Sequence, residues 1–328
     1  MSHLVADRPT WFDQSSRVRL EIGGPDRAKF LHNLTTNDVK RLAEGFGQES
    51  FVTSPQGKTL AYISLLATDR AILLRTDPGA ADSFVPHLQK YGVFDDVSID
   101  DVSPQTFEYH LVGPGLDHLV AALDVDLEAM VKPLRHVEVN LAGHPVRLIR
   151  ESPLGESGWT WVGPIEGSKA VLDQFTAWKV AIGEPATFEA LRIEAGTPVS
   201  GIDVQSGNLP QEVGRDARAI NFVKGCYLGQ ETVARLDALG HVNRILRGGW
   251  IEGTSVIPPV GTPLIGDDGK TVGSITSAAF SANHNAPVFL GYVRVAQANS
   301  GTRLSIPSIM GENGEPAVAV VAELPLSR

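Results

Sequence analysis

The only cysteine of the 328-residue sequence, Cys226, lies among residues that favour thiol chemistry. Lys224 stands two positions before it, and the apolar spacing of GQETVARLDALG predicts a helix that begins a few residues after it. A nearby cation and a helix N-terminus both favour the thiolate over the thiol. Gly225 lets the backbone turn tightly or approach a ligand closely. These residue types predict a reactive thiol.

The same stretch also has a purely structural interpretation, which the local residues leave open. A free cysteine is among the most often buried residues and usually acts as a small inert hydrophobe. Glu231 and Arg235 are four residues apart on the predicted helix, so they can form a surface ion pair. Gln230 and Glu231 either bind polar edges of a ligand or favour the start of the helix, and Lys224 is then a solvated charge.

Phosphate loops and metal sites find no support in the sequence. Two Gly-Lys-Thr triplets, at 57–59 and 269–271, lack the glycine that a phosphate-binding loop needs five residues before its Gly-Lys pair, because Val52 and Leu264 stand there. The nine histidines show no metal-ligand spacing, and one cysteine cannot hold an iron–sulfur cluster alone. We therefore expect no resident metal.

The composition is that of a soluble globular protein, with 42% hydrophobic and 20% charged residues. The length predicts two or three domains. A formal net charge of -10 argues against broad nucleic-acid binding. No apolar run approaches the ~20 residues of a membrane span, and the N-terminus has no basic segment followed by an apolar stretch. We therefore expect no signal peptide, no membrane or nucleic-acid partner, and a cytoplasmic location.

The elements that must position the cysteine stretch alternate between strands and helices in the first part of the chain. Strand-like runs are found at 17–24 and, three times, between 49 and 76. Helical spacing is found at five places: 25–34, 79–92, 116–123, 167–183 and 187–198. Such alternation with short connections favours an α+β layer in which helices back an antiparallel sheet.

The character of the sequence changes at about Arg244. From there on, short strand-like runs are separated by Gly, Pro and Asp-Gly turns, which is typical of a small all-β barrel or sandwich. We place a domain boundary near Ile245. The residues by themselves thus predict an α+β part followed by a C-terminal all-β part.

The segment KGCYLGQE (224–231) resembles the signature K-G-C-Y-x-G-Q-E of the YgfZ family, folate-binding proteins related to the aminomethyltransferase (T-protein) of the glycine cleavage system. The similarity extends over nearly the whole chain. Four further segments are similar to family or superfamily elements: GGPDRAKFLHNLTTNDV (23–39), LRIEAGTPVSGID (191–203), LPQEVG (209–214) and GYVR (291–294).

The resemblance implies an α+β fold with three lobes around a central cavity that holds tetrahydrofolate or a related reduced folate. The domains it implies are a discontinuous folate-binding domain, a ferredoxin-like α+β domain and a C-terminal β-barrel. Their expected boundaries are 1–48 plus 135–244 for the folate-binding domain, 49–134 for the ferredoxin-like domain and 245–328 for the barrel.

Site residues are also implied by the resemblance. Glu194 matches the carboxylate that pairs with the N–H edge of the pterin, a role suited to two parallel hydrogen bonds. Cys226 matches the functional thiol, which faces the folate or a client protein, and Lys224 attracts the folate tail or tunes the thiol. The full set of folate-binding residues implied in this way is Glu194, Lys224, Gly225, Tyr227, Gly229, Gln230, Glu231 and Arg235.

One departure bears on the reaction. The aminomethyltransferases carry two adjacent aspartates where this chain has Ala61 and Tyr62, so the proton handling expected for methylene transfer is missing. The resemblance therefore implies an accessory protein in the assembly or repair of iron–sulfur clusters of client enzymes. The alternatives are a folate-dependent aminomethyltransferase and, without a folate role, a thiol-redox or scaffold protein. Whether the protein is itself an enzyme stays open at this point.

Overall fold

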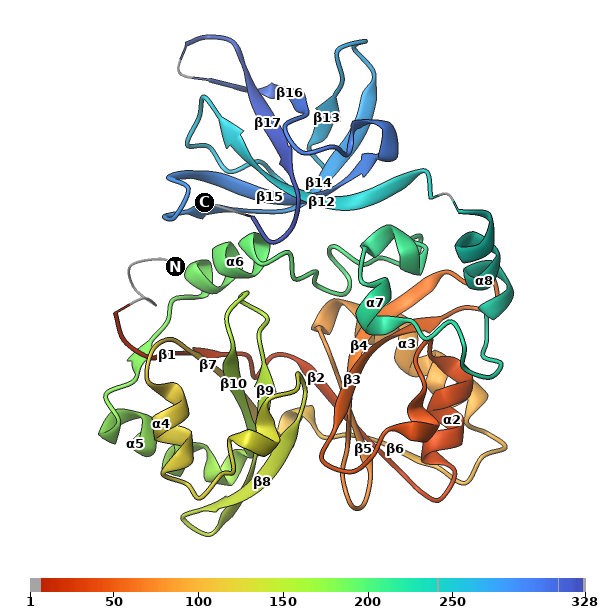
Figure 1. Ribbon diagram of the computed structural model, residues 1–328, viewed down its shortest axis with the longest axis vertical. Coiled ribbons are helices and arrows are strands. Elements are labelled where there is room, and N and C mark those ends of the chain that lie inside the picture. The colour runs from red at the N-terminus through yellow and green to blue at the C-terminus, as the bar shows by residue number, and fades with distance from the viewer. Residues whose placement is uncertain (1–6, 241, 312, 327–328) are drawn as a thin grey trace.

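The described part of the chain contains three β-sheets, and Figure 1 shows each of them as a separate lobe. The computed structural model describes residues 7–240, 242–311 and 313–326. The expectation of no signal peptide concerns the N-terminus, and residues 1–6 lie outside the described part of the chain. Among the described helices, none is both long and apolar enough to cross a membrane.

The first lobe is a five-stranded antiparallel sheet of order β3-β4-β5-β2-β6. Its strands are β2 (Val18–Gly23), β3 (Gly47–Thr53), β4 (Thr59–Ala67), β5 (Ile72–Thr76) and β6 (Ser98–Asp101). Helices α2 (Arg27–Leu34) and α3 (Pro78–Tyr91) pack on it, and Phe30, Phe84 and Leu88 are buried against Leu65 of β4. This is the helix-backed antiparallel sheet that the periodicity predicts.

The second lobe is a six-stranded sheet of order β11-β1-β7-β10-β9-β8. Its strands are β1 (Thr10–Asp13), β7 (Thr106–Val112), β8 (His136–Leu141), β9 (His144–Glu151), β10 (Gly158–Pro164) and β11 (Ala181–Ile182). Helices α4 (Leu116–Ala121) and α5 (Ser168–Ala177) cover it, and its core contains Trp159, Trp161 and Phe175. Only the pairing of β1 with β11 is parallel among its described pairings.

The third lobe is a closed barrel of order β12-β15-β14-β13-β16-β17, which lies at the top of Figure 1. Its strands are β12 (Arg244–Glu252), β13 (Pro263–Ile265), β14 (Thr271–Ser281), β15 (Ala286–Arg294), β16 (Arg303–Met310) and β17 (Pro316–Ala322). Phe289, Leu304 and Val321 belong to its core. The barrel expected from the short runs after Arg244, and the mixed α+β class, are confirmed.

Among the described residues, three helices connect the lobes. These are α6 (Pro185–Glu194), α7 (Asp216–Ala219) and α8 (Gln230–Leu239). Helix α6 packs against β14 and β15, so it lies between the barrel and the two sheets. Single 3₁₀ turns complete the chain: η1 (Val39–Arg41), η2 (Ser103–Gln105), η3 (Glu128–Met130), η4 (Ile165–Gly167), η5 (Pro210–Val213) and η6 (Val295–Gln297).

The segments that form each sheet do not begin and end at the expected domain boundaries. The boundary between 48 and 49 falls inside β3, and the one between 134 and 135 separates β7 from β8 although both belong to the six-stranded sheet. Strand β1 pairs with β7, almost a hundred residues later in the chain. Pairing over such separations depends on which edges meet in space, and local periodicity carries no information about it.

Candidate functional site

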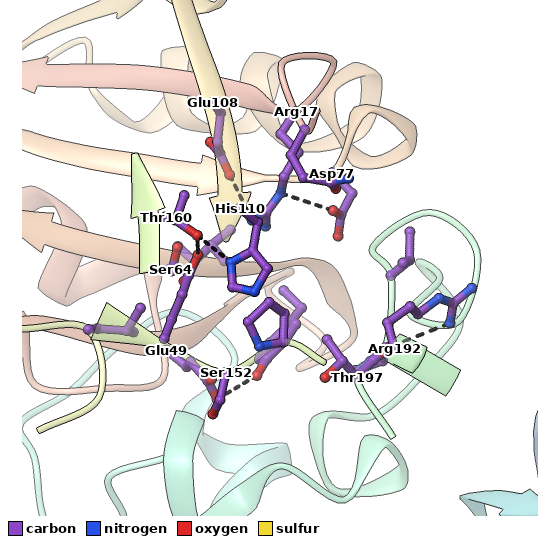
Figure 2. A pocket seen from close by; sticks show the side chains of 18 of the residues that line it. Arg17, Glu49, Ser64, Asp77, Glu108, His110, Ser152, Thr160, Arg192 and Thr197 are labelled. Carbon is purple, nitrogen blue, oxygen red and sulfur yellow. Dashed lines mark hydrogen bonds and ion pairs between the residues drawn. The ribbon is translucent and has the colours of Figure 1, made fainter. Parts of the chain in front are cut away.

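A cavity of about 240 Å³ lies where the two sheets meet α6. Side chains from all these elements line it, and Figure 2 shows them converging on one space. The polar lining includes Glu49 and Ser64 from the five-stranded sheet, Glu108, His110 and Thr160 from the six-stranded sheet, Glu189 and Arg192 from α6, Arg218 from α7 and Arg215 just before α7. The cavity is therefore shared between lobes and exists only when they are assembled.

At this lining and just behind it, arginines of the first lobe hold carboxylates of the six-stranded sheet. The Arg75 Nη2 atom lies 2.6 Å from Glu108 Oε1 and 2.9 Å from Glu151 Oε1. Burial opposes ionisation of Glu151, but Arg75 outweighs it and lowers the pKa of that carboxyl to about 2. Arg17 and Arg19 add further contacts to Glu108, at 3.2 and 3.4 Å. Because these groups are buried and paired, removing one partner costs far more than at the surface.

His110 belongs to this network through Thr160. Its Nδ1 lies 2.8 Å from the Thr160 hydroxyl oxygen, and that hydroxyl donates in turn to the Glu151 carboxylate. His110 is almost fully buried, and this burial lowers its pKa to about 4, so the imidazole is neutral at physiological pH. A neutral histidine, a threonine and a carboxylate thus form a chain of hydrogen bonds that ends at the cavity wall.

Tyr62 and Glu49 form a second pair on the opposite wall. The Tyr62 hydroxyl donates to Glu49 Oε2 at 2.5 Å, and Arg218 Nε lies 3.4 Å from the same oxygen. Burial and the neighbouring Glu49 raise the pKa of Tyr62 well above its ordinary value. Ala61 is buried in the core of the five-stranded sheet. Tyr62, one of the two residues that replace the aspartates, therefore still contacts a carboxylate, that of Glu49.

Helix α6 supplies the third wall. The Arg192 guanidinium donates through Nε and Nη2 to Glu189 Oε2, at 3.0 and 2.6 Å, and through Nη1 to Asp203 at 2.8 Å. Arg192 is buried, whereas the side chain of Glu189 is about half exposed to the cavity side. This pairing anchors the Glu189 carboxylate through Oε2, which accepts both charge-assisted hydrogen bonds.

Comparison with known proteins identifies the family of this fold. Residues 3–224 match the family model described as the GCVT N-terminal domain, and residues 247–326 match the glycine cleavage T-protein C-terminal barrel domain. The chain belongs to the glycine cleavage T-protein family. The two matched segments together span both sheets, the cavity and the barrel.

Individual relatives of the T-protein family agree with this. A chloroplastic protein of Arabidopsis thaliana named "putative transferase" is 30% identical over 321 residues, which covers 95% of this chain and 70% of that protein. An aminomethyltransferase of Cutibacterium acnes is 27% identical and covers 98% of this chain and 88% of its own. The crystal structure of aminomethyltransferase T from Bartonella henselae superimposes with a TM-score of 0.83 at 22% identity, over 98% of this chain and 87% of that chain.

Glu194, the carboxylate expected to meet the pterin, lies outside the central cavity. It accepts hydrogen bonds from Ser281 Oγ at 2.6 Å and Asn283 Nδ2 at 2.7 Å, in a separate hollow between α6 and the barrel. In an α-helix, side chains five positions apart point in directions that differ by about 140°, because there are about 3.6 residues per turn. Glu189 and Glu194 therefore face different ways. Glu189 is the α6 glutamate that lines the cavity.

The cysteine segment also lies away from the cavity lining and packs at the end of α2. Lys224 is buried and its Nζ donates to the carbonyl oxygens of His32, Thr35 and Asn37, at 2.6, 2.6 and 2.9 Å. Burial lowers the pKa of Lys224 to about 7, and the three carbonyls hold its ammonium form. This lysine therefore ties the segment to the first lobe.

Other residues of the segment have structural contacts of their own. Tyr227 is buried in a core between the sheet and the barrel. Gly229 has φ +82, and a Cβ there would lie 2.4 Å from the Ser54 carbonyl oxygen, so only glycine fits. Cys226 is exposed, and α8 begins at Gln230, as the helical spacing predicts. The implied folate-binding residues that are absent from the described cavity lining are Glu194, Lys224, Gly225, Tyr227, Gly229, Gln230, Glu231 and Arg235.

Apart from Tyr62, the residues that line the cavity were not identified from the sequence, although one signal points to some of them. Glu108 and His110 stand two positions apart in the strand TFEYHLV, so both side chains point to the same face. A glutamate and a histidine on the buried face of a strand require partners. In the described chain, no group of three or more His, Cys, Asp or Glu side chains is placed to hold a metal.

Proposed function

We propose that the protein binds tetrahydrofolate, or a related reduced folate, in the central cavity. The observation that carries the proposal is the cavity itself, which is bounded by both sheets and α6 and combines apolar and aromatic side chains with many polar and charged ones, several of them fixed by buried ion pairs. Tyr62, Ile63, Leu134 and Phe188 supply apolar surface for a flat heterocycle. Family membership supports the same ligand class.

The polar groups of the cavity suit a folate. Arg215 and Arg218 bring positive charge to the lining, which the glutamyl carboxylates of a folate require. The Glu189 carboxylate, held by Arg192, is suited to the donor edge of an aminopyrimidine ring. Among the described residues, the buried Ser64 hydroxyl has no hydrogen-bond partner, as expected where a polar ligand completes the site. When bound, the folate would supply the one-carbon chemistry.

Within the T-protein family, we further propose a YgfZ-like role as an accessory protein in the assembly or repair of iron–sulfur clusters of client enzymes. The KGCYLGQE signature supports this role. Cys226 is exposed outside the cavity, beside Phe222 and Val223, whose side chains are 42% and 92% exposed. A client protein can therefore reach the thiol without entering the folate cavity.

A second function, aminomethyl transfer to tetrahydrofolate, is favoured by one observation. Glu49 lines the cavity and accepts the hydrogen bond of Tyr62, so a carboxylate is available for proton transfer although residues 61 and 62 are not aspartates. Turnover of an aminomethyl donor in the presence of tetrahydrofolate, abolished by Glu49→Gln, would establish this function. If no turnover is observed, aminomethyl transfer is ruled out and the accessory role remains the proposed function.

Calorimetric titration with tetrahydrofolate under anaerobic conditions tests the proposal. We expect wild type and Cys226→Ala to bind with the same affinity, because the thiol is not part of the cavity lining. Cys226→Ala should nevertheless fail to restore function in cells that lack the native protein. Lack of binding by the wild type contradicts the folate proposal, and full rescue by Cys226→Ala contradicts the accessory role of the thiol.

A further inference from the structure

Two buried polar atoms of cavity-lining residues have neither a hydrogen-bond nor an ion-pair partner among the described residues, whereas a third atom without a hydrogen bond, Arg17 Nε, is paired with Asp77 at 3.2 Å. The two unpaired atoms are the hydroxyl oxygen of Ser64 on β4 and Nε2 of His110 on β7, which belong to different sheets but line the same cavity. Figure 2 shows both side chains in the group around the cavity, with His110 turned to Thr160 on one side. Buried polar groups in folded proteins almost always have partners, so two unpaired ones at a cavity point to a ligand.

The hydrogen-bond chain behind His110 fixes which of its nitrogens carries the proton. The Thr160 hydroxyl has one proton and donates it to the Glu151 carboxylate, which can only accept. The Thr160 oxygen must then accept from His110, so Nδ1 of the imidazole is the protonated nitrogen. Because the ring is neutral, Nε2 carries a lone pair and can only accept a hydrogen bond.

Glu151 is itself fixed in its ionised, acceptor form. Arg75 donates to both of its carboxylate oxygens, through Nη1 at 3.2 Å and Nη2 at 2.9 Å. The same guanidinium holds Glu108, so the orientation of the chain from Arg75 to His110 is set by buried charges of two sheets. Thr160 and Glu151 therefore act as positioning residues for His110, and neither has to touch the ligand.

We propose that His110 Nε2 accepts a hydrogen bond from a ring N–H of the ligand in the cavity and that the Ser64 hydroxyl makes a second polar contact to the same ligand. The group recognised there is an uncharged heterocyclic N–H and not an anion, since His110 offers a lone pair and the carboxylates of Glu108 and Glu151 border the same cavity. The identity of this ligand as a pterin rests on the proposed function. The assignment of His110 as an acceptor does not.

The protonation state is tested first, without any ligand. In ¹⁵N-labelled protein at pH 7, long-range ¹H–¹⁵N correlation should show His110 with a protonated Nδ1 and an unprotonated Nε2. Thr160→Val, which removes the hydroxyl but keeps the shape of the side chain, should release this preference and populate the other tautomer. An Nε2–H or an imidazolium in the wild type overturns the proposal.

The second test measures tetrahydrofolate affinity of matched variants. His110→Asn keeps an amide donor at the position of Nδ1 but deletes Nε2, and we expect about tenfold weaker binding, as for loss of one hydrogen bond in a closed site. His118→Asn is the control, since His118 is exposed on α4, and should bind as wild type does. Addition of tetrahydrofolate should also move the ¹⁵N resonance of Nε2 in the wild type.

The outcomes separate the two proposals. If the wild type binds tetrahydrofolate and His110→Asn binds within twofold of it, the folate proposal stands and the role of His110 is overturned. If the wild type does not bind tetrahydrofolate, the folate proposal fails, and the tautomer measurement alone decides whether His110 presents an acceptor. A crystal structure with folate bound and only a water molecule on Nε2 also overturns the inference.

Discussion

Glu151→Gln should destabilise the protein by about 3 kcal/mol at pH 7. Burial disfavours the charge of Glu151, but Arg75 reverses this and lowers the pKa from an ordinary 4.5 to about 2. The difference of about 2.5 between these values corresponds to about 3 kcal/mol of folding free energy. Glutamine keeps the shape of the side chain but removes its charge, so the variant forfeits this contribution and leaves Arg75 with Glu108 alone.

The stabilising contribution of Glu151 should decrease only towards low pH. Because the pKa of Glu151 is lower in the folded than in the unfolded protein, its contribution is fully present above about pH 4.5 and is lost as the pH falls towards 2. The difference in unfolding free energy between wild type and Glu151→Gln should therefore be constant from about pH 7 to 5. It should narrow progressively below about pH 4.5.

Urea unfolding followed by tryptophan fluorescence is the suitable assay. Four of the five tryptophans pack in the core of the six-stranded sheet that contains Glu151: Trp11, Trp159, Trp161 and Trp178. The control is Glu138→Gln on the neighbouring strand β8, where an exposed ion pair with Arg147 should contribute less than about 1 kcal/mol. The reasoning is refuted if Glu151→Gln costs no more than this control at pH 7, or if the difference does not narrow at low pH.

Three further substitutions test other parts of the structure. Lys224→Met should lower the free energy of unfolding by about 2 kcal/mol, because three buried carbonyls lose their donor, and denaturant unfolding measures this. Gly229→Ala should cost more than about 1 kcal/mol in the same assay, since both its φ of +82 and the nearby Ser54 carbonyl exclude a Cβ; an unchanged midpoint would contradict the glycine requirement. Glu189→Gln should weaken tetrahydrofolate binding about tenfold in calorimetry while Glu194→Gln leaves it unchanged, and the opposite order would restore Glu194 as the pterin ligand.

The local spacing of apolar residues was sufficient to predict much of the fold. Alternating apolar residues and turn signals predicted the α+β class and the barrel, and α8 begins at Gln230 as its apolar spacing indicates. The spacing at 187–198 predicted α6, which the structure places at Pro185–Glu194. These features depend on neighbours in sequence, which is why a sequence pattern carries them.

The site depends on contacts that no local pattern contains. Arg75 meets Glu108 and Glu151 across two sheets, 33 and 76 residues away in sequence. The orientation of α6, which turns Glu189 and not Glu194 to the cavity, follows from packing of the helix on the barrel strands β14 and β15. The resemblance was correct at the level of the T-protein family, but its motif marked residues, such as Lys224 and Gly229, whose contacts in this structure hold the cysteine segment in place.

The central claim is that the cavity between the two sheets and α6 binds a reduced folate. A crystal structure of the protein with tetrahydrofolate tests it most directly. The account predicts the pterin inside this cavity, with a ring N–H on His110 Nε2 and a polar contact to Ser64. A pterin bound instead in the hollow beside Glu194, or on the surface at Cys226, would contradict the account.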